Sequence, residues 1–185
     1  MNVETETERL VRLPAPALVG VRRAVMENRD PVEAVELLRR IGLEAGEAYH
    51  ALFQNWLVEE GAPADPAELS AEEFWQRLSD FLDALGLGTV RYELLHSGVF
   101  AIASDDWVEA DSSGPGHPGC QLTTGLLAEL LRRVAGQDLA ILEVECRGLG
   151  SDSCRFLAGS AAALEHVFGA MERGAAYQDA VASLP

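Results

Sequence analysis

The sequence predicts an α+β fold in which helices cover an antiparallel sheet of about four strands. Over the first 85 residues, apolar side chains recur at spacings of three and four, the period of an amphipathic helix. After residue 89 they recur at every second position in two pairs of short runs, each pair joined by a glycine-containing turn, as expected of hairpins. Strands and helices do not alternate one by one, which argues against a parallel sheet.

The 185 residues fit a single domain. We expect residues 1–13 to be a polar leader and residues 14–185 to form the domain. Hydrophobic residues make up 48% of the chain and charged residues 24%, a balance typical of a globular protein.

Two helices are predicted at the start of the domain, over 14–29 and from Pro31 to about residue 60. Asp30 and Pro31 provide an N-cap and a first-turn proline for the second helix. This long helix packs against a helix of the same chain or forms a dimer interface, and Gly42 and Gly46 on one side would permit close approach in either case. Its apolar face comprises Val35, Leu38, Gly42, Ala45, Tyr49, Leu52 and Trp56.

A capping box of Ser70 and Glu73 opens the third helix, which ends at Gly86. Strands follow over 90–95 and 99–103, then a loop over 111–119 and a helix over 120–135. The second strand pair covers 139–144 and 154–158, and the tail from Ser160 is helical. The apolar stripe of that tail is Leu164, Val167, Phe168 and Met171.

The charge excludes several functions. The net charge of −16 disfavours binding to nucleic acid or to anionic membranes. All 14 basic residues are arginine, so chemistry that depends on lysine is absent. No apolar run is long enough to span a membrane, and the polar N-terminus lacks the features of a secretory signal. Three cysteines, an odd number, fit a reducing cytoplasm.

The three cysteines lie at the edges of predicted elements. Cys120 stands where the loop enters a helix, while Cys146 and Cys154 flank the turn of the second hairpin. Three thiolates at such positions can supply three ligands of a tetrahedral zinc ion. His117, three residues before Cys120, and Glu143, three residues before Cys146, are both candidates for the fourth ligand.

The segments GCQLTTGLLAELL and ILEVECRGLGSDSCRFLAG resemble the bacterial 4-vinyl reductase domain, also called the hydrocarbon-binding domain. The spacing C-x22-E-x2-C-x7-C within residues 120–159 carries the resemblance. In sensor domains of aromatic-responsive sigma-54 activators this pattern holds a structural zinc. The resemblance therefore implies Cys120, Glu143, Cys146 and Cys154 as ligands, with Glu143 preferred to His117.

The upstream segment RYELLHSGVF is also similar to this family and to subunits of the TRAPP tethering particle. The resemblance implies a TRAPP-like sheet beneath helices, a homodimer formed through N-terminal helices, and a buried apolar pocket. Candidates to line that pocket are Tyr92, His96, Phe100 and Trp107, with Trp56 and Trp75 from the helices.

No catalytic constellation or glycine-rich cofactor motif stands out, so we expect a binding protein rather than an enzyme. The leading hypothesis is a zinc-stabilised sensory domain that binds a small apolar or aromatic molecule and acts through a partner protein. One alternative is a tetrapyrrole carrier or reductase accessory in chlorophyll-type metabolism. Another is a dimeric scaffold without a ligand.

Overall fold

Two antiparallel hairpins build one four-stranded sheet, in a computed structural model that describes residues 13–110 and 119–185. The strands are β1 (Arg91–His96), β2 (Val99–Ser104), β3 (Ala140–Glu145) and β4 (Cys154–Gly159), in the spatial order β1-β2-β4-β3. The second strands of the two hairpins are paired at the centre of the sheet. The predicted fold class is therefore confirmed.

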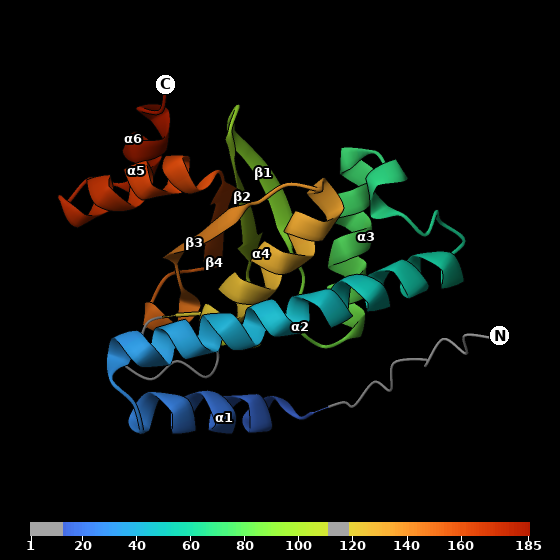
Figure 1. Cartoon of the computed structure of the whole chain (residues 1–185), viewed down its shortest axis with the longest axis horizontal. Coiled ribbons are helices and arrows are strands. Elements are labelled where there is room, and N and C mark those ends of the chain that lie inside the picture. The colour runs from blue at the N-terminus through green and yellow to red at the C-terminus, as the bar shows by residue number, and fades with distance from the viewer. Residues whose placement is uncertain (1–12, 111–118) are drawn as a thin grey trace.

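The described helices lie before, between and after the hairpins (Figure 1). They are α1 (Ala15–Glu27), α2 (Pro31–Glu59), α3 (Ala71–Ala84), α4 (Gln121–Ala135), α5 (Ala161–Glu172) and α6 (Tyr177–Ala182). Short 3-10 turns, η1 (Pro66–Glu68) and η3 (Arg147–Leu149), occupy the connector before α3 and the β3–β4 turn.

The predicted helix ends are confirmed by their hydrogen bonds. The Asp30 carboxylate accepts from the amide of Val32, and the Ser70 hydroxyl accepts from the amide of Glu73. Both bonds satisfy amide groups that have no partner within the first turn of a helix. Gly136 ends α4 with a φ of 63°, in the left-handed region that glycine favours.

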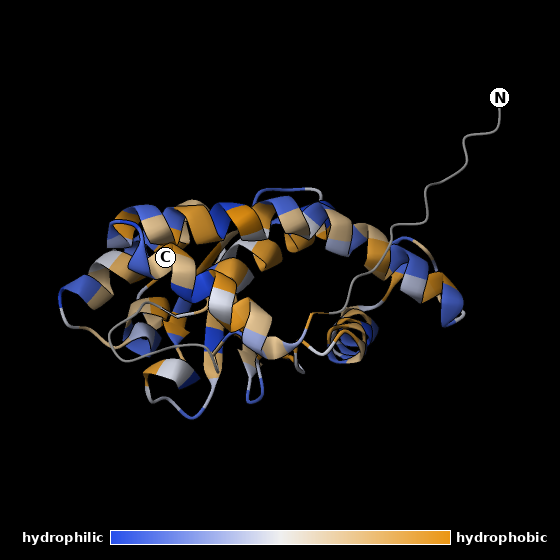
Figure 2. Ribbon diagram, turned by 90° about the horizontal axis from the view of Figure 1, so that it is seen from below, coloured by the Kyte–Doolittle hydropathy of each residue, from blue (hydrophilic) through white to orange (hydrophobic). Residues whose placement is uncertain are grey.

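Helices cover both faces of the sheet. On one face, Ile102 of β2 and Phe156 of β4 pack with residues of α2, α3 and α4 in the larger core. On the other face, Ala101 and Leu157 pack under α5 and α6. Figure 2 shows hydrophobic and hydrophilic residues alternating along the helices, as expected when each helix places one side on a core.

Close backbone contact joins α2 to α4. A Cβ atom added to Gly42 would lie 2.0 Å from the Leu122 carbonyl oxygen, and one added to Gly125 would lie 2.0 Å from the Arg39 carbonyl oxygen. Gly46 likewise faces Glu129 of α4. The small residues of α2 therefore pack within the chain, as the intramolecular interpretation predicts.

Two details differ from the sequence predictions. The C-terminal tail is two helices, since the chain turns at Gly174, whose φ is 91°. Phe168, predicted on the apolar stripe of this tail, is 49% exposed, because the buried side of α5 is formed by Leu164, Val167 and Ala170. The predicted polar leader lies outside the described residues except for Leu13. Within the described ranges, no helix combines the length and apolar character that crossing a membrane requires.

Candidate metal centre

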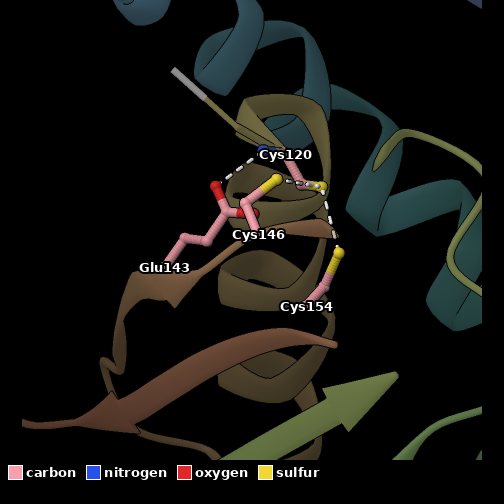
Figure 3. Close-up of side chains that lie close together, drawn as sticks. All are labelled: Cys120, Glu143, Cys146 and Cys154. Carbon is pink, nitrogen blue, oxygen red and sulfur yellow. Dashed lines mark hydrogen bonds between the residues drawn. The ribbon is translucent and has the colours of Figure 1, made fainter. Parts of the chain in front are cut away.

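Three cysteine sulfurs meet where the N-terminus of α4 lies over the β3–β4 hairpin (Figure 3). Cys120 is the N-cap residue of α4, Cys146 follows β3 directly, and Cys154 is the first residue of β4. The Cys120 sulfur lies 3.9 Å from each of the other two sulfurs, and all three residues are buried. The hairpin and the helix start predicted from the sequence thus bring the three thiols together.

A β-bulge brings Glu143 to the same place. Residues three apart on a regular strand point to opposite faces, so an uninterrupted β3 would separate Glu143 from Cys146. The register of β3 shifts between Glu143, which pairs with Phe156, and Glu145, which pairs with Arg155. The extra residue restores both side chains to the face that α4 covers, as Figure 3 shows.

Glu143 approaches the helix through a gap that only glycine leaves open. Its Oε2 accepts a hydrogen bond of 2.6 Å from the Cys120 amide. A Cβ atom on Gly119 would lie 2.0 Å from this same oxygen. Its other oxygen, Oε1, is buried and has no hydrogen-bond partner among the described residues. A buried carboxylate oxygen without a partner is costly, and a bound cation would satisfy it.

The four side chains fit a tetrahedral zinc ion. One ligand atom from each of Cys120, Glu143, Cys146 and Cys154 can be chosen so that all lie within 4.8 Å of one another. Two thiolates at about 2.3 Å from a tetrahedral zinc stand about 3.8 Å apart, close to the 3.9 Å separations in this cluster. Four protein ligands would complete the coordination sphere, the arrangement of a structural rather than a catalytic zinc. His117 lies outside the described residues.

The acidic groups of the cluster influence one another strongly. Hydrogen bonds to Cys146 and Cys154, together with burial, raise the pKa of Cys120. Hydrogen bonds from Cys120 and Cys146 lower the pKa of Cys154 to about 4. Burial and the neighbouring Cys146 raise the pKa of Glu143 to about 8. Without a cation, some of these groups therefore keep protons that metal binding would displace.

A second set of buried polar residues fixes the start of α4. The Glu109 carboxylate accepts from the amides of Leu122 and Thr123, at 3.0 and 2.8 Å, and from the Thr123 hydroxyl. The Trp107 indole donates to the same hydroxyl. Burial raises the pKa of Glu109, while these hydrogen bonds and the positive charge of Arg22 favour its ionised form. The sequence analysis did not identify Glu109 or Arg22, because neither lies in a local motif.

Gly119→Ala is expected to weaken metal binding without unfolding the chain. The added methyl group occupies the position of Glu143 Oε2, so the carboxylate must leave the Cys120 amide. Loss of one ligand or its orientation reduces metal affinity by at least about 10-fold. A zinc competition titration with a chromophoric chelator measures the change. Gly98→Ala is the matched control, since nothing lies within 4 Å of its added Cβ atom; equal affinities for the two variants would contradict the prediction.

Glu143 also predicts the pH dependence of the metal-free protein. Its pKa rises from about 4.5 to about 8 in the folded chain, so between these values the folded state keeps a proton that the unfolded state has lost. The free energy of unfolding therefore falls as pH rises through this window. Urea unfolding with chelator present should show this fall for wild type relative to Glu143→Gln. A stability difference that stays constant across this window would contradict the assignment.

The aromatic residues predicted for the ligand pocket separate into two places. Tyr92 of β1 and Phe100 of β2 contact each other, with ring centroids 5.4 Å apart, and both contact Trp75 of α3 at 5.0 and 5.6 Å. Trp107 lies in the large core, 2% exposed, at the start of α4. Trp56 packs against Phe53 and Phe81 in that core.

Two cavities flank this aromatic cluster. One, of about 680 Å³, lies at the tip of the β1–β2 hairpin and is lined in part by Leu94, His96, Phe100 and Leu139. The other, of about 570 Å³, includes Trp75 and Tyr92 in its lining. Both volumes fall in the range of small-molecule sites. His96 and Phe100 therefore share one cavity, Tyr92 lines the other, and Trp107 lines neither.

Comparison with known families agrees with this architecture. Residues 102–160 match the family model of the vinyl-4-reductase domain. The match runs from β2 to just beyond the end of β4 and includes all four residues of the cysteine and glutamate cluster. The predicted resemblance to the 4-vinyl reductase domain is thus confirmed. No curated protein matches the sequence.

Solved structures share the fold over most of the chain. The phenol-responsive sensory domain of the transcription activator PoxR, solved with phenol, aligns with a TM-score of 0.66 at 19% identity, covering 90% of this chain and 83% of that domain. A trafficking protein particle complex subunit 3 from Naegleria fowleri, covalently bound to palmitic acid, aligns with a TM-score of 0.58 at 11% identity, covering 78% of this chain and 91% of that one. At these identities the comparison establishes the shared fold.

Proposed function

We propose that this chain is a zinc-stabilised domain that binds a small apolar or aromatic molecule and acts through a partner protein. The observation that carries the proposal is the cluster of three buried sulfurs and one carboxylate at the start of α4. Cys120, Glu143, Cys146 and Cys154 would hold the zinc, which would fasten α4 to the β3–β4 hairpin. Because this ligand set needs reduced cysteines, we place the protein in the cytoplasm.

The ligand part of the proposal is supported by the aromatic cluster and its flanking cavities. Trp75, Tyr92 and Phe100 present aromatic surface, and His96 adds a polar group that can hydrogen-bond a ligand. The PoxR domain, which shares this fold, is described as phenol-responsive. A small apolar or aromatic molecule is therefore the class of ligand that we propose.

Exposed apolar side chains support a homodimer or a partner interface at the N-terminal helices. Several lie along α1 and α2, where water would otherwise contact them. They are Val21, Val32, Ile41, Leu43 and Val58, each between 39% and 65% exposed.

Phenol and native mass spectrometry together test the proposed function. We expect a chain purified without chelator to carry zinc and to gain thermal stability when phenol is added, because a ligand that binds only the folded state stabilises it. Tyr92→Ala should reduce this gain, whereas Trp56→Phe in the core should not. A bound porphyrin with a Soret absorption band would instead support the tetrapyrrole carrier. A zinc-loaded dimer that carries no extractable ligand and does not respond to phenol would support the scaffold.

A further inference from the structure

One arginine on α1 is buried where its helix is otherwise largely exposed. Arg22 is 2% exposed, while its neighbours Val21 and Arg23 face solvent. Burial of a guanidinium group requires compensating partners. The partners of Arg22 lie far along the chain from α1, so its position depends on tertiary structure rather than on the helix itself.

These partners are at the start of α4. The Arg22 Nη2 atom donates a hydrogen bond of 2.8 Å to the carbonyl oxygen of Gly119, and Nε lies 3.7 Å from Glu109 Oε1. Gly119 directly precedes Cys120, and the Glu109 carboxylate holds the amides of the first turn of α4. Arg22 therefore reaches the backbone that presents Cys120.

Three separate elements fix this short stretch of backbone. Arg22 holds the Gly119 carbonyl from α1, and Glu109 holds the helix amides from the segment after β2. Glu143 accepts from the Cys120 amide on the side of β3. A metal ligand whose backbone is held from several directions keeps its orientation, which raises the affinity for the metal.

The apolar attachment of α1 is small by comparison. The core cluster beneath it consists of Met26, Ala34 and Leu38, with Val25 and Leu122 packed at its edge. The buried polar contact of Arg22 is therefore a substantial part of what docks α1, and it ends on a residue adjacent to a proposed zinc ligand.

We propose that Arg22 is a positioning residue that couples the docking of α1 to zinc binding. This inference rests on the proposed zinc site. Arg22 holds Gly119 and Cys120 in the geometry for the metal, and zinc in turn holds the carbonyl that Arg22 binds. Such coupling is reciprocal, so whatever factor α1 docking adds to zinc affinity, zinc adds to α1 docking. Metal loss would then release the helix that carries exposed Val21 and change the surface available to a partner.

Hydrogen exchange and zinc competition test the two directions of the coupling on the full chain. In the zinc-loaded wild type, α1 amides are expected to exchange slowly, and chelation should accelerate them by about 10-fold while α3 changes little. Arg22→Gln should show fast α1 exchange even with zinc present and should bind zinc at least about 10-fold more weakly. The matched control is Arg23→Gln, on the exposed side of α1, which should behave as wild type in both measurements.

The outcomes separate the coupling from the site on which it rests. A wild-type chain that binds no zinc refutes the proposed site and the coupling with it. A chain that binds one zinc, but whose α1 exchange does not respond to chelation, refutes the coupling alone. Equal acceleration of α1 and α3 on chelation also refutes it, because zinc would then hold the whole fold rather than this helix. The wild-type comparison decides the question even if Arg22→Gln does not fold.

Discussion

Cys154→Ser is expected to abolish zinc binding and to lower the free energy of unfolding by at least about 3 kcal/mol. Zinc affinity in a structural site is folding free energy, amounting to about 10–16 kcal/mol in small zinc domains, and a serine hydroxyl does not replace a thiolate ligand. Cys154 is fully buried on a central strand, so its loss affects the core directly. Metal analysis and urea unfolding measure the two effects.

Ala158→Ser on the same strand is the matched control for Cys154→Ser. Ala158 is also fully buried, so this variant places a hydroxyl group in the same core without altering a sulfur. It should retain zinc and lose only about 1–3 kcal/mol. Excess chelator should then destabilise wild type and Ala158→Ser but have no effect on Cys154→Ser. A chelator effect that persists in Cys154→Ser would show that the metal binds elsewhere.

Gly42→Ala is expected to be the most damaging single methyl addition in α2. The new Cβ atom would lie 2.0 Å from the Leu122 carbonyl oxygen and 2.8 Å from the Leu126 amide nitrogen. Backbone atoms cannot move aside as a flexible side chain can, so α2 and α4 must separate along their contact. We expect a loss of about 3 kcal/mol or more, above the usual range for overpacking of side chains. Thermal and urea unfolding measure the loss.

Gly20→Ala provides the control for the change in helix propensity. Gly20 lies in α1, and nothing is found within 4 Å of its added Cβ atom. Alanine should therefore stabilise the protein by about 0.5–1 kcal/mol. Opposite signs for Gly20→Ala and Gly42→Ala are expected. A neutral Gly42→Ala would mean that α2 and α4 do not meet at these glycines.

Local sequence signals predicted the secondary structure well. Asp30 with Pro31, and Ser70 with Glu73, specify helix starts through backbone hydrogen bonds that involve only neighbouring residues. The alternation of apolar residues predicted both hairpins because each central strand packs on two cores. The tail was less accurate, since tertiary packing rather than periodicity decides which side of α5 is buried.

The candidate site was predictable only in part. The spacing of Cys120, Glu143, Cys146 and Cys154 carried the resemblance that selected them, and the structure gathers these four side chains. The bulge that turns Glu143 toward the sulfurs has no sequence signature in β3 that periodicity reveals. Arg22 and Glu109 contact the start of α4 across long sequence separations, so their positions emerge only with the fold.

The pocket residues show the same limit of local reasoning. Tyr92, His96 and Phe100 lie on one hairpin and were grouped by proximity in sequence, yet Tyr92 lines a different cavity from the other two. Trp107 follows the hairpin closely but turns into the core to bind Thr123. Trp75, from a helix, completes the aromatic cluster instead.

The most direct test of the central claim is the native mass spectrum of the protein purified without chelator. The cluster of Cys120, Glu143, Cys146 and Cys154 predicts one zinc ion per chain. It also predicts that thiol reagents label the cysteines slowly until a chelator removes the metal. A metal-free chain with three freely titratable thiols would contradict the zinc site and the function built on it.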